Sequence, residues 1–328
     1  MACYHPIEAW DYSPDQFDLL SKRTVSFDGP ADPAGREEMI RQGRRLMLPC
    51  RHCVGCRLAH SREWANRIVM EQIYHQDSWF LTLTYDDEHL PSAHPVSAFG
   101  DILSVHASLV KADLQKFLKR LRFNFGQPIR YYAAGEYGSQ TYRPHYHLLV
   151  FGLHLDDLKV IRKNFNGDQY YISDFISQCW PYGIHILGRV TWQSAAYVAR
   201  YTMKKATHGF DKRYYSAAGI EPEFQTMSLR PAIGRRYYDD HPEIFDFQTF
   251  SVSTPQGGRK MTPPEYFRKL YNASHPVDAY VSSYNSVINS ELKIHLKLML
   301  TDNDYYDILN IEEEKTLSRI SSLTRDDI

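Results

Sequence analysis

The sequence from Arg143 to Phe151 constrains the fold more than any other part of the chain, because it is an apolar run interrupted by two histidines. An apolar run of this length is typical of a strand inside a sheet. Side chains two positions apart on a strand share a face, so His145 and His147 should project side by side, with Tyr146 on the other face. Two neutral imidazoles so placed can hold a metal ion. Both histidines can equally be ordinary hydrogen-bonded sheet residues, and the pattern alone leaves this open.

The segments around this strand predict an α+β fold. Apolar periodicity predicts helices at residues 57–76, 108–123, 155–165 and 194–205, and strands at 79–85, 129–136, 144–152 and 184–192. After the first helix the order is β-α-β-β-α-β and then a helix. This is the order of the ferredoxin-like split βαβ sandwich, in which a central antiparallel sheet carries helices on one face. The strands at 129–136 and 144–152 should form a hairpin that brings Glu136 near the histidines.

Three segments are predicted along the chain. Residues 1–56 look irregular, with turn signals at Gly29-Pro30 and Asp32-Pro33. Residues 57–237 contain the predicted sandwich and the histidines. Residues 238–328 form a mainly helical extension, with a helix near 284–300, and end in an acidic tail.

The charge distribution suggests a local anionic ligand. The formal net charge is −1, but residues 44–70 carry six arginines against one glutamate, and residues 193–237 carry eight Lys or Arg against three acids. The tail, residues 301–328, carries eight acids against three bases. Two basic stretches offset by an acidic tail fit a protein that binds an anion locally, although solvated charged faces would give the same counts.

Other features of the sequence argue against a membrane or secreted protein. No stretch approaches the roughly 20 apolar residues of a membrane span, and the N-terminus lacks the apolar core of a signal peptide. Five cysteines, an odd count, do not fit a secreted disulfide scaffold. A reducing cytoplasm is therefore the expected compartment.

Glu136, His145 and His147 together form a candidate metal site. A carboxylate and two imidazoles supply three ligands and leave positions open for water and a substrate oxygen. A divalent cation bound there can polarise a phosphoryl oxygen and stabilise the charge that builds up during displacement. The mixed nitrogen and oxygen set suits Mg²⁺ or Mn²⁺, and Zn²⁺ would also bind.

Tyr197 and Tyr201 are candidate nucleophiles on the last predicted helix. They lie four residues apart and so share one helical face. Arg200 and Lys204 each follow one of them by three residues, and a nearby cation favours the phenolate of a tyrosine, whose free pKa is about 10. Lys204 is in step with the tyrosines and is the expected phosphate contact. The alternative is an amphipathic helix whose tyrosines only pack on the sheet.

Four cysteines form a second candidate metal site. Cys50, Cys53 and Cys56 have the two-residue gaps typical of zinc ligands, and Cys3 can complete a tetrahedral set. His5 or His52 can take the fourth position instead. Free thiols and an iron–sulfur cluster are the alternatives to zinc, and Cys179 is expected to be structural.

These motifs together resemble the HUH endonucleases, in the branch of the rolling-circle replication initiators. The resemblance rests on Glu136, the His145–His147 strand and the later Tyr197-x₃-Tyr201 helix. The strings at residues 80–91 (FLTLTYDDEHLP), 197–201 (YVARY) and 227–234 (MSLRPAIG) further resemble initiators of small single-stranded DNA phages, nearest to the gokushovirus-like microviruses. The resemblance covers roughly residues 1–275. One departure is Arg200, where such helices often carry Lys.

The resemblance implies a reaction and its partners. A tyrosine would attack a phosphodiester in single-stranded origin DNA, form a 5′-phosphotyrosine and release a 3′-OH for the host polymerase. The second tyrosine would cleave the regenerated origin, and the freed 3′-OH would rejoin the first end. Arg57, Arg62, Arg200 and Lys205 are the expected DNA contacts. The protein would act in the cytoplasm of a bacterial host.

Two other functions remain open from the sequence. One is an HUH-type transposase with the same chemistry, against which the paired tyrosines argue. The other is a non-catalytic, zinc-containing nucleic-acid-binding module with exposed aromatic residues on an open sheet face. The chain has no phosphate loop of the G-x₄-G-K-[ST] type, so strand separation would need a host helicase.

Overall fold

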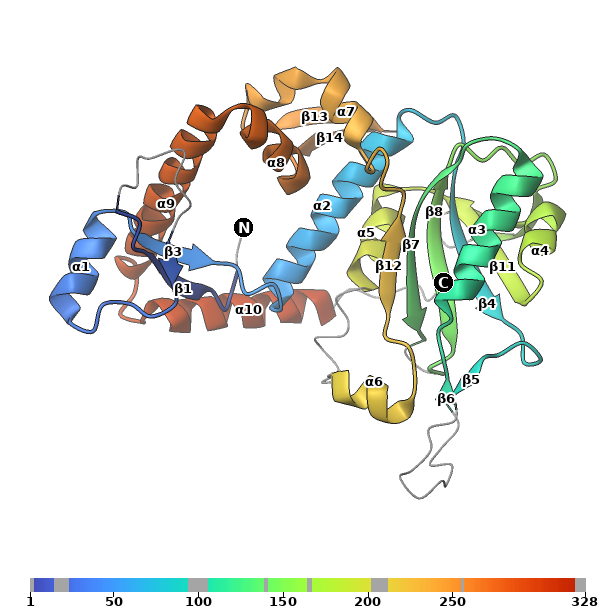
Figure 1. The fold of residues 1–328 in the computed structure, drawn as a ribbon, viewed down its shortest axis with the longest axis horizontal. Coiled ribbons are helices and arrows are strands. Elements are labelled where there is room, and N and C mark those ends of the chain that lie inside the picture. Colours follow the sequence, from blue (N-terminus) through green and yellow to red (C-terminus); the bar gives the residue numbers. More distant parts are fainter. Residues whose placement is uncertain are drawn as a thin grey trace. The chain divides into compact units, whose positions relative to one another are not determined.

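The computed structural model describes residues 3–14, 24–93, 106–138, 141–163, 167–201, 212–254 and 257–321. The chain forms two compact units: unit 1 comprises residues 1–59 and 265–328, and unit 2 comprises residues 60–264 (Figure 1). Helix α2 (Val54–Gln72) contributes residues to both. The predicted division at residues 57–237 stays a prediction about parts that fold independently.

Unit 2 is built on a seven-stranded sheet in which every neighbouring pair is antiparallel. Its order is β12 (Phe224–Met227), β7 (Arg130–Tyr137), β8 (Pro144–Phe151), β4 (Ser78–Tyr85), β11 (Gly183–Arg189), β10 (Gln169–Ile172) and β9 (Lys159–Lys163). The central four strands, in the order β7-β8-β4-β11, have the neighbours that a ferredoxin-like split βαβ unit requires. The predicted α+β class and the β7–β8 hairpin are confirmed.

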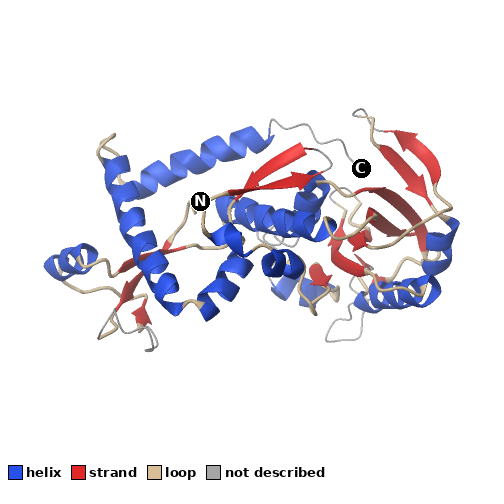
Figure 2. Ribbon diagram, turned by 90° about the horizontal axis from the view of Figure 1, so that it is seen from above, coloured by secondary structure: helices blue, strands red, loops and turns tan. Residues whose placement is uncertain are grey.

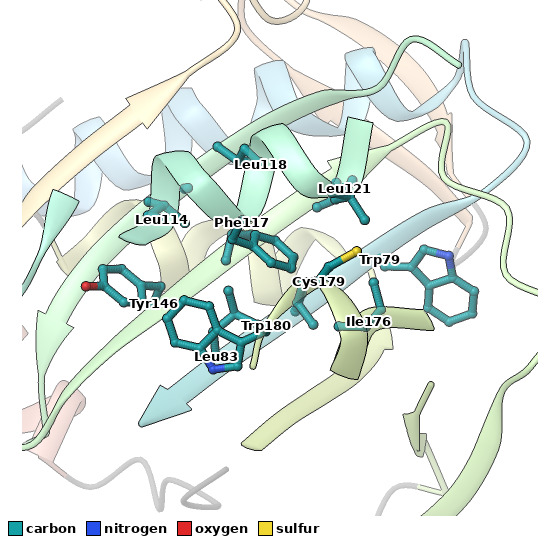
Figure 3. Close-up of a cluster of buried hydrophobic side chains, with 14 of the residues drawn as sticks. Trp79, Leu83, Leu114, Phe117, Leu118, Leu121, Tyr146, Ile176, Cys179 and Trp180 are labelled. Carbon is teal, nitrogen blue, oxygen red and sulfur yellow. The ribbon is translucent and has the colours of Figure 1, made fainter. Parts of the chain in front are cut away.

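One face of this sheet packs against α3 (Lys111–Phe125) and α4 (Asp174–Cys179). The apolar residues of α3 recur at helical spacing, and the helix ends at Gly126, which adopts the left-handed conformation that glycine allows without strain. Figure 3 shows the resulting core, in which α3 residues meet side chains of the strands and of α4. Its buried members include Leu83, Leu114, Phe117, Leu118, Leu121, Tyr146, Ile176, Cys179 and Trp180. Cys179 thus has the structural position that was predicted.

The second face of the sheet is also covered, so the prediction of helices on one face only was wrong. Helix α2 and α5 (Trp192–Tyr201) pack there, with Ile68 and Val198 fully buried against Phe80 and Leu149. The physical reason lies in the central strands, whose side chains are apolar on both faces. A strand of that kind is stable only when both faces are covered.

The segment predicted as a helix at residues 155–165 contains an edge strand instead. Strand β9 pairs with β10, and a register shift interrupts the pairing between Tyr170 and Tyr171. The β-branched pair Val160-Ile161 favours a strand, and the flanking lysines protect an exposed edge from pairing with another chain. The helix expected before the last strand of the ferredoxin-like order is supplied by α4, where the Ser173 side chain accepts a hydrogen bond from the Ile176 N–H as the N-cap.

The remaining elements of unit 2 are short. They are β5 (Ser92–Ala93), β6 (His106–Ala107), α6 (Lys212–Ala218), α7 (Arg235–Asp240), a 3₁₀ helix (Pro242–Phe245) and the hairpin of β13 (Phe250–Thr254) and β14 (Gly257–Met261). Buried Glu71 on α2 anchors the segment before α7, because it pairs with Arg130 and accepts a hydrogen bond from the Gly234 N–H at 2.7 Å.

Unit 1 is more regular than the sequence suggested. Residues 1–56 were expected to be irregular, but they form the sheet β2-β1-β3 and one helix, followed along the chain by three C-terminal helices (Figure 2). The elements are β1 (Ile7–Asp11), β2 (Val25–Ser26), α1 (Pro33–Arg41), β3 (Arg45–Leu48), α8 (Glu265–Ser274), α9 (Pro276–Leu298) and α10 (Tyr305–Ser321). These strands are too short to stand out between turn signals. The helical C-terminal extension is confirmed, and none of the helices in the described ranges is long and apolar enough to cross a membrane.

Candidate active site and metal centres

Glu136, His145 and His147 meet on the face of the sheet covered by α2 and α5. Strands β7 and β8 place Glu136 directly opposite His145 in the antiparallel register. Glu136 Oε1 is 2.6 Å from His145 Nε2 and 2.9 Å from His147 Nε2. One ligand atom from each residue lies within 4.8 Å of the other two. The three residues can therefore hold a single cation, and the structure brings together the ligand set that the sequence predicted.

The environment of this group favours binding of a cation. Glu136 and His147 are only 2% and 3% exposed. Burial opposes ionisation of Glu136, but hydrogen bonds to His145 and His147 outweigh it and hold the pKa of the carboxyl below its usual range. An ionised carboxylate beside two imidazole nitrogens is a donor set that divalent metals accept. A buried anion of this kind is stable only with such partners or with a metal.

Two residues of β4 orient His147. Thr82 lies opposite His147 in the β4–β8 register, and its Oγ1 is 3.0 Å from His147 Nδ1. The ring of Phe80 stacks on the imidazole, with centroids 5.4 Å apart and an interplanar angle of 15°. A partner on Nδ1 fixes the ring and leaves Nε2 facing the shared site. Neither residue was predicted from the sequence, although the alternation in β4 would have put both on the histidine face.

Tyr197 is the candidate nucleophile that the structure brings to this centre. Its ring centroid lies 5.4 Å from that of His147, at an interplanar angle of 77°. The same ring lies edge-on to Phe80 at 6.3 Å. Helix α5 is held against α2 here, because the Ser61 hydroxyl donates a 2.6 Å hydrogen bond to the Ala196 carbonyl oxygen. The phenol is half-buried at the edge of the metal centre.

The other predicted substrate contacts are placed less completely. Tyr201 is the last residue of α5, and the side chains of Tyr201 and Arg200 are not among the described ones. Lys204 and Lys205 lie outside the described residues. Arg57 is a half-buried residue of α2 in unit 1, and Arg62 is an exposed residue of α2 in unit 2. Roles for all of them in catalysis or DNA contact stay predictions.

The four predicted cysteines converge in unit 1. Cys50 Sγ is 3.9 Å from Cys56 Sγ, and Cys53 Sγ is 4.0 Å from Cys3 Sγ. Four sulfurs that bind one zinc ion tetrahedrally, each at about 2.3 Å, lie about 3.8 Å apart. The arrangement therefore fits a metal site, and its fourth member is Cys3 rather than His5 or His52.

Backbone N–H groups point at the sulfurs of this cluster. The Cys50 N–H donates to Cys3 Sγ at 3.2 Å. The N–H groups of Tyr4 and Cys56 donate to Cys53 Sγ at 3.3 and 3.4 Å. Burial raises the pKa of the Cys53 thiol, but these donors outweigh it and hold that pKa at about 7. Donors of this kind stabilise thiolates, the form of cysteine that binds metals.

The C-terminal helix closes over the cysteine cluster. Glu313 of α10 accepts a hydrogen bond from the Val54 N–H at 3.3 Å, where α2 begins, and also pairs with His5. The Tyr4 and Thr316 hydroxyls are 2.8 Å apart. The acidic residues of this segment thus partly serve the packing of unit 1.

Comparisons with known proteins place the site within a described family. The model for the replication-associated protein ORF2 family matches residues 78–206, from β4 to just past α5. The chain is 34% identical over 286 residues to the replication-associated protein ORF2 of Spiroplasma virus 4, with 85% of each chain covered. It is 38% identical over 240 residues to the replication-associated protein VP4 of Bdellovibrio phage phiMH2K, covering 70% of this chain and 69% of that protein. Replication-associated protein ORF4 of Chlamydia phage 1 is 31% identical over 231 residues, covering 68% and 53%. No solved structure matches the chain.

Proposed function

Because this chain belongs to the replication-associated protein ORF2 family, with relatives in phages, we propose that it initiates replication by nicking single-stranded origin DNA. The enzyme is a metal-dependent HUH endonuclease and strand transferase. The observation that carries the proposal is the convergence of Glu136, His145 and His147 beside the ring of Tyr197, inside the segment that the family model matches.

The tyrosine performs the cleavage. The Tyr197 phenol loses its proton, its oxygen bonds to the phosphorus of the scissile phosphodiester, and the 3′ oxygen leaves as a hydroxyl. The DNA is then joined to the protein through a 5′-phosphotyrosine. The edge-on packing of Tyr197 against His147 and Phe80 restricts the phenol to the rim of the metal centre, which lowers the entropic cost of bringing it to the phosphate.

Glu136, His145 and His147 would hold Mg²⁺ or Mn²⁺. When bound, the cation supplies positive charge to a phosphoryl oxygen as negative charge builds up there. Thr82 keeps the His147 ring in the orientation that presents Nε2 to the site. Glu136 is ionised before any cation arrives, because its pKa is already low.

Tyr201 would provide the second attack. It lies one helical turn after Tyr197 and so shares a face of α5 with it. The 3′-OH released by the second cleavage would attack the first phosphotyrosine and close a DNA circle. Lys204 would contact the phosphate, and Arg57, Arg62, Arg200 and Lys205 would contact the strand. A host helicase and polymerase would supply strand separation and synthesis inside the bacterial host cell.

The alternatives receive less support. The relatives are named for replication rather than transposition. A module that binds nucleic acid on an open sheet face would need exposed aromatic residues there, but α2 and α5 cover one face of the central strands and α3 and α4 the other.

The test uses an origin-containing single-stranded oligonucleotide labelled at one end. With Mn²⁺ present, a label on the 3′ side of the nick should stay with the protein through denaturation, and a label on the 5′ side should leave as free DNA. The opposite pattern would mean a 3′-linked adduct and a different reaction. The complete absence of an adduct on any strand of the genome would refute nicking by a tyrosine.

Unit 1 would carry a structural Zn²⁺ on its four cysteines. The purified chain is expected to contain one equivalent of zinc. The double change Cys50→Ser and Cys53→Ser should remove it and destabilise unit 1 by about 4 kcal/mol or more, because the metal joins the N-terminal segment to α2. Metal analysis and hydrogen exchange of β1 and α10 measure both effects. Cys179→Ser is the matched control and should keep the zinc, whereas zinc retained by the double variant would disprove the site.

A further inference from the structure

A cluster of two arginines and a tryptophan lies at the start of α5. Arg62 and Asn66 are one turn apart on α2 and share a face. The Trp192 indole N–H donates to Asn66 Oδ1 at 2.9 Å. The guanidinium of Arg259 lies over the Trp192 ring, 3.6 Å from its centroid. All four residues belong to unit 2.

The β13–β14 hairpin determines the position of Arg259. Its register pairs Val252 with Arg259 and Phe250 with Met261. Val252 and Met261 are 2% and 3% exposed, so this face of the hairpin is turned inward. Lys260, the next residue, lies on the opposite face of the strand and is exposed. The hairpin thus places one of two adjacent cations in the cluster and the other in solvent.

The cluster brings two positive charges together without a negative one. Within the described part of the chain, neither Arg62 nor Arg259 forms an ion pair with a carboxylate. Burial and the positive charge of Arg62 hold the pKa of the Arg259 guanidinium below its usual range. Stacking on Trp192 and the hairpin hold Arg259 in place against this repulsion. Like charges held together in this way provide an attractive site for an anion.

We infer that Arg62 and Arg259 bind one phosphodiester group of the single-stranded DNA, beside the nicking centre and distinct from it. Trp192 precedes Tyr197 by five residues on α5, a rise of about 7.5 Å along the helix. A phosphate held here would therefore belong to a nucleotide close to the scissile one. One face of the indole is already occupied by Arg259, so Trp192 supports the arginine rather than stacking on a base. This inference rests on the proposed function for the identity of its ligand.

The experiment measures binding of a fluorescent single-stranded oligonucleotide as a function of salt, without added Mg²⁺ or Mn²⁺, so that cleavage does not contribute. Arg259→Gln should weaken binding about tenfold, as expected for losing one charge-assisted phosphate contact. The slope of log affinity against log salt should become shallower by about 0.7. Arg62→Gln should have a similar effect. The double variant should add little, because both residues contact the same phosphate.

Lys260→Gln is the matched control, because it removes the same charge from the neighbouring residue on the outer face of the strand. It should change affinity less than about twofold. Equal losses in Arg259→Gln and Lys260→Gln, or no loss in Arg259→Gln, would overturn the inference. An adduct formed normally by a variant that still binds tightly would reject this phosphate site and leave the nuclease intact. A selective loss of binding in a chain that forms no adduct would keep the site and reject the nuclease.

Discussion

Replacing Tyr197 and Tyr201 together with phenylalanine is expected to abolish covalent attachment of the protein to origin DNA. The rate of adduct formation should fall by at least about a thousandfold, because the change removes the attacking oxygen itself. The Tyr197 ring would keep its packing against His147 and Phe80, so folding and DNA binding should change little. A labelled oligonucleotide run with the protein on a denaturing gel measures the effect.

The single variants separate the roles of the two tyrosines. Tyr197→Phe alone should impair the first nick if Tyr197 begins the cycle, and Tyr201→Phe alone should impair release of a closed circle. Tyr306→Phe removes an exposed phenol in unit 1 and serves as the control. Adduct formation that survives in the double variant would mean that the nucleophile lies elsewhere in the chain.

The largest expected effect on metal binding comes from His145→Ala combined with His147→Ala. Loss of two of the three ligands should abolish Mn²⁺ binding at this centre and slow cleavage by about a thousandfold or more. Affinity for single-stranded DNA should stay within a few fold, because strand binding depends on cations elsewhere. Titration calorimetry with Mn²⁺ and the cleavage assay measure the two effects separately.

A graded companion variant tests the geometry of the centre. Thr82→Val keeps the shape of the side chain but removes the oxygen that lies 3.0 Å from His147 Nδ1. It should weaken Mn²⁺ binding by about 10- to 100-fold. Thr84→Val on the same face of β4 is the control, since no side-chain hydrogen bond from Thr84 is found within the described ranges. Unchanged Mn²⁺ affinity in the histidine double variant would show that the metal binds at a different place.

The metal centre could be predicted because its determinants are local. His145 and His147 share a face by the two-residue period of a strand, and a short hairpin brings Glu136 opposite them. The same reasoning predicted three cysteines in one stretch and named Cys3 as the fourth. Each case depends on spacing within a short segment or on chemistry that only a few residue types can perform.

The parts that escaped prediction depend on contacts between distant segments. Arg259 reaches Trp192 through a hairpin whose own packing is not visible in its sequence. The helices on the second sheet face follow from burial of Phe80 and Leu149, but their docking required the tertiary fold. Strand β9 was taken for a helix because a short polar-flanked segment fits either period, and pairing with β10 decided between them.

The measurement that tests the central claim most directly is the mass of the DNA-linked peptide. Trypsin cleaves after Arg189, Arg200 and Lys204, so Tyr197 and Tyr201 fall on different peptides, residues 190–200 and 201–204. After nuclease digestion of the adduct, we expect a nucleotide 5′-phosphate on one of these two peptides, attached to tyrosine. A nucleotide found on any other residue, or a cleaved strand with no protein-linked nucleotide, would contradict the proposed reaction.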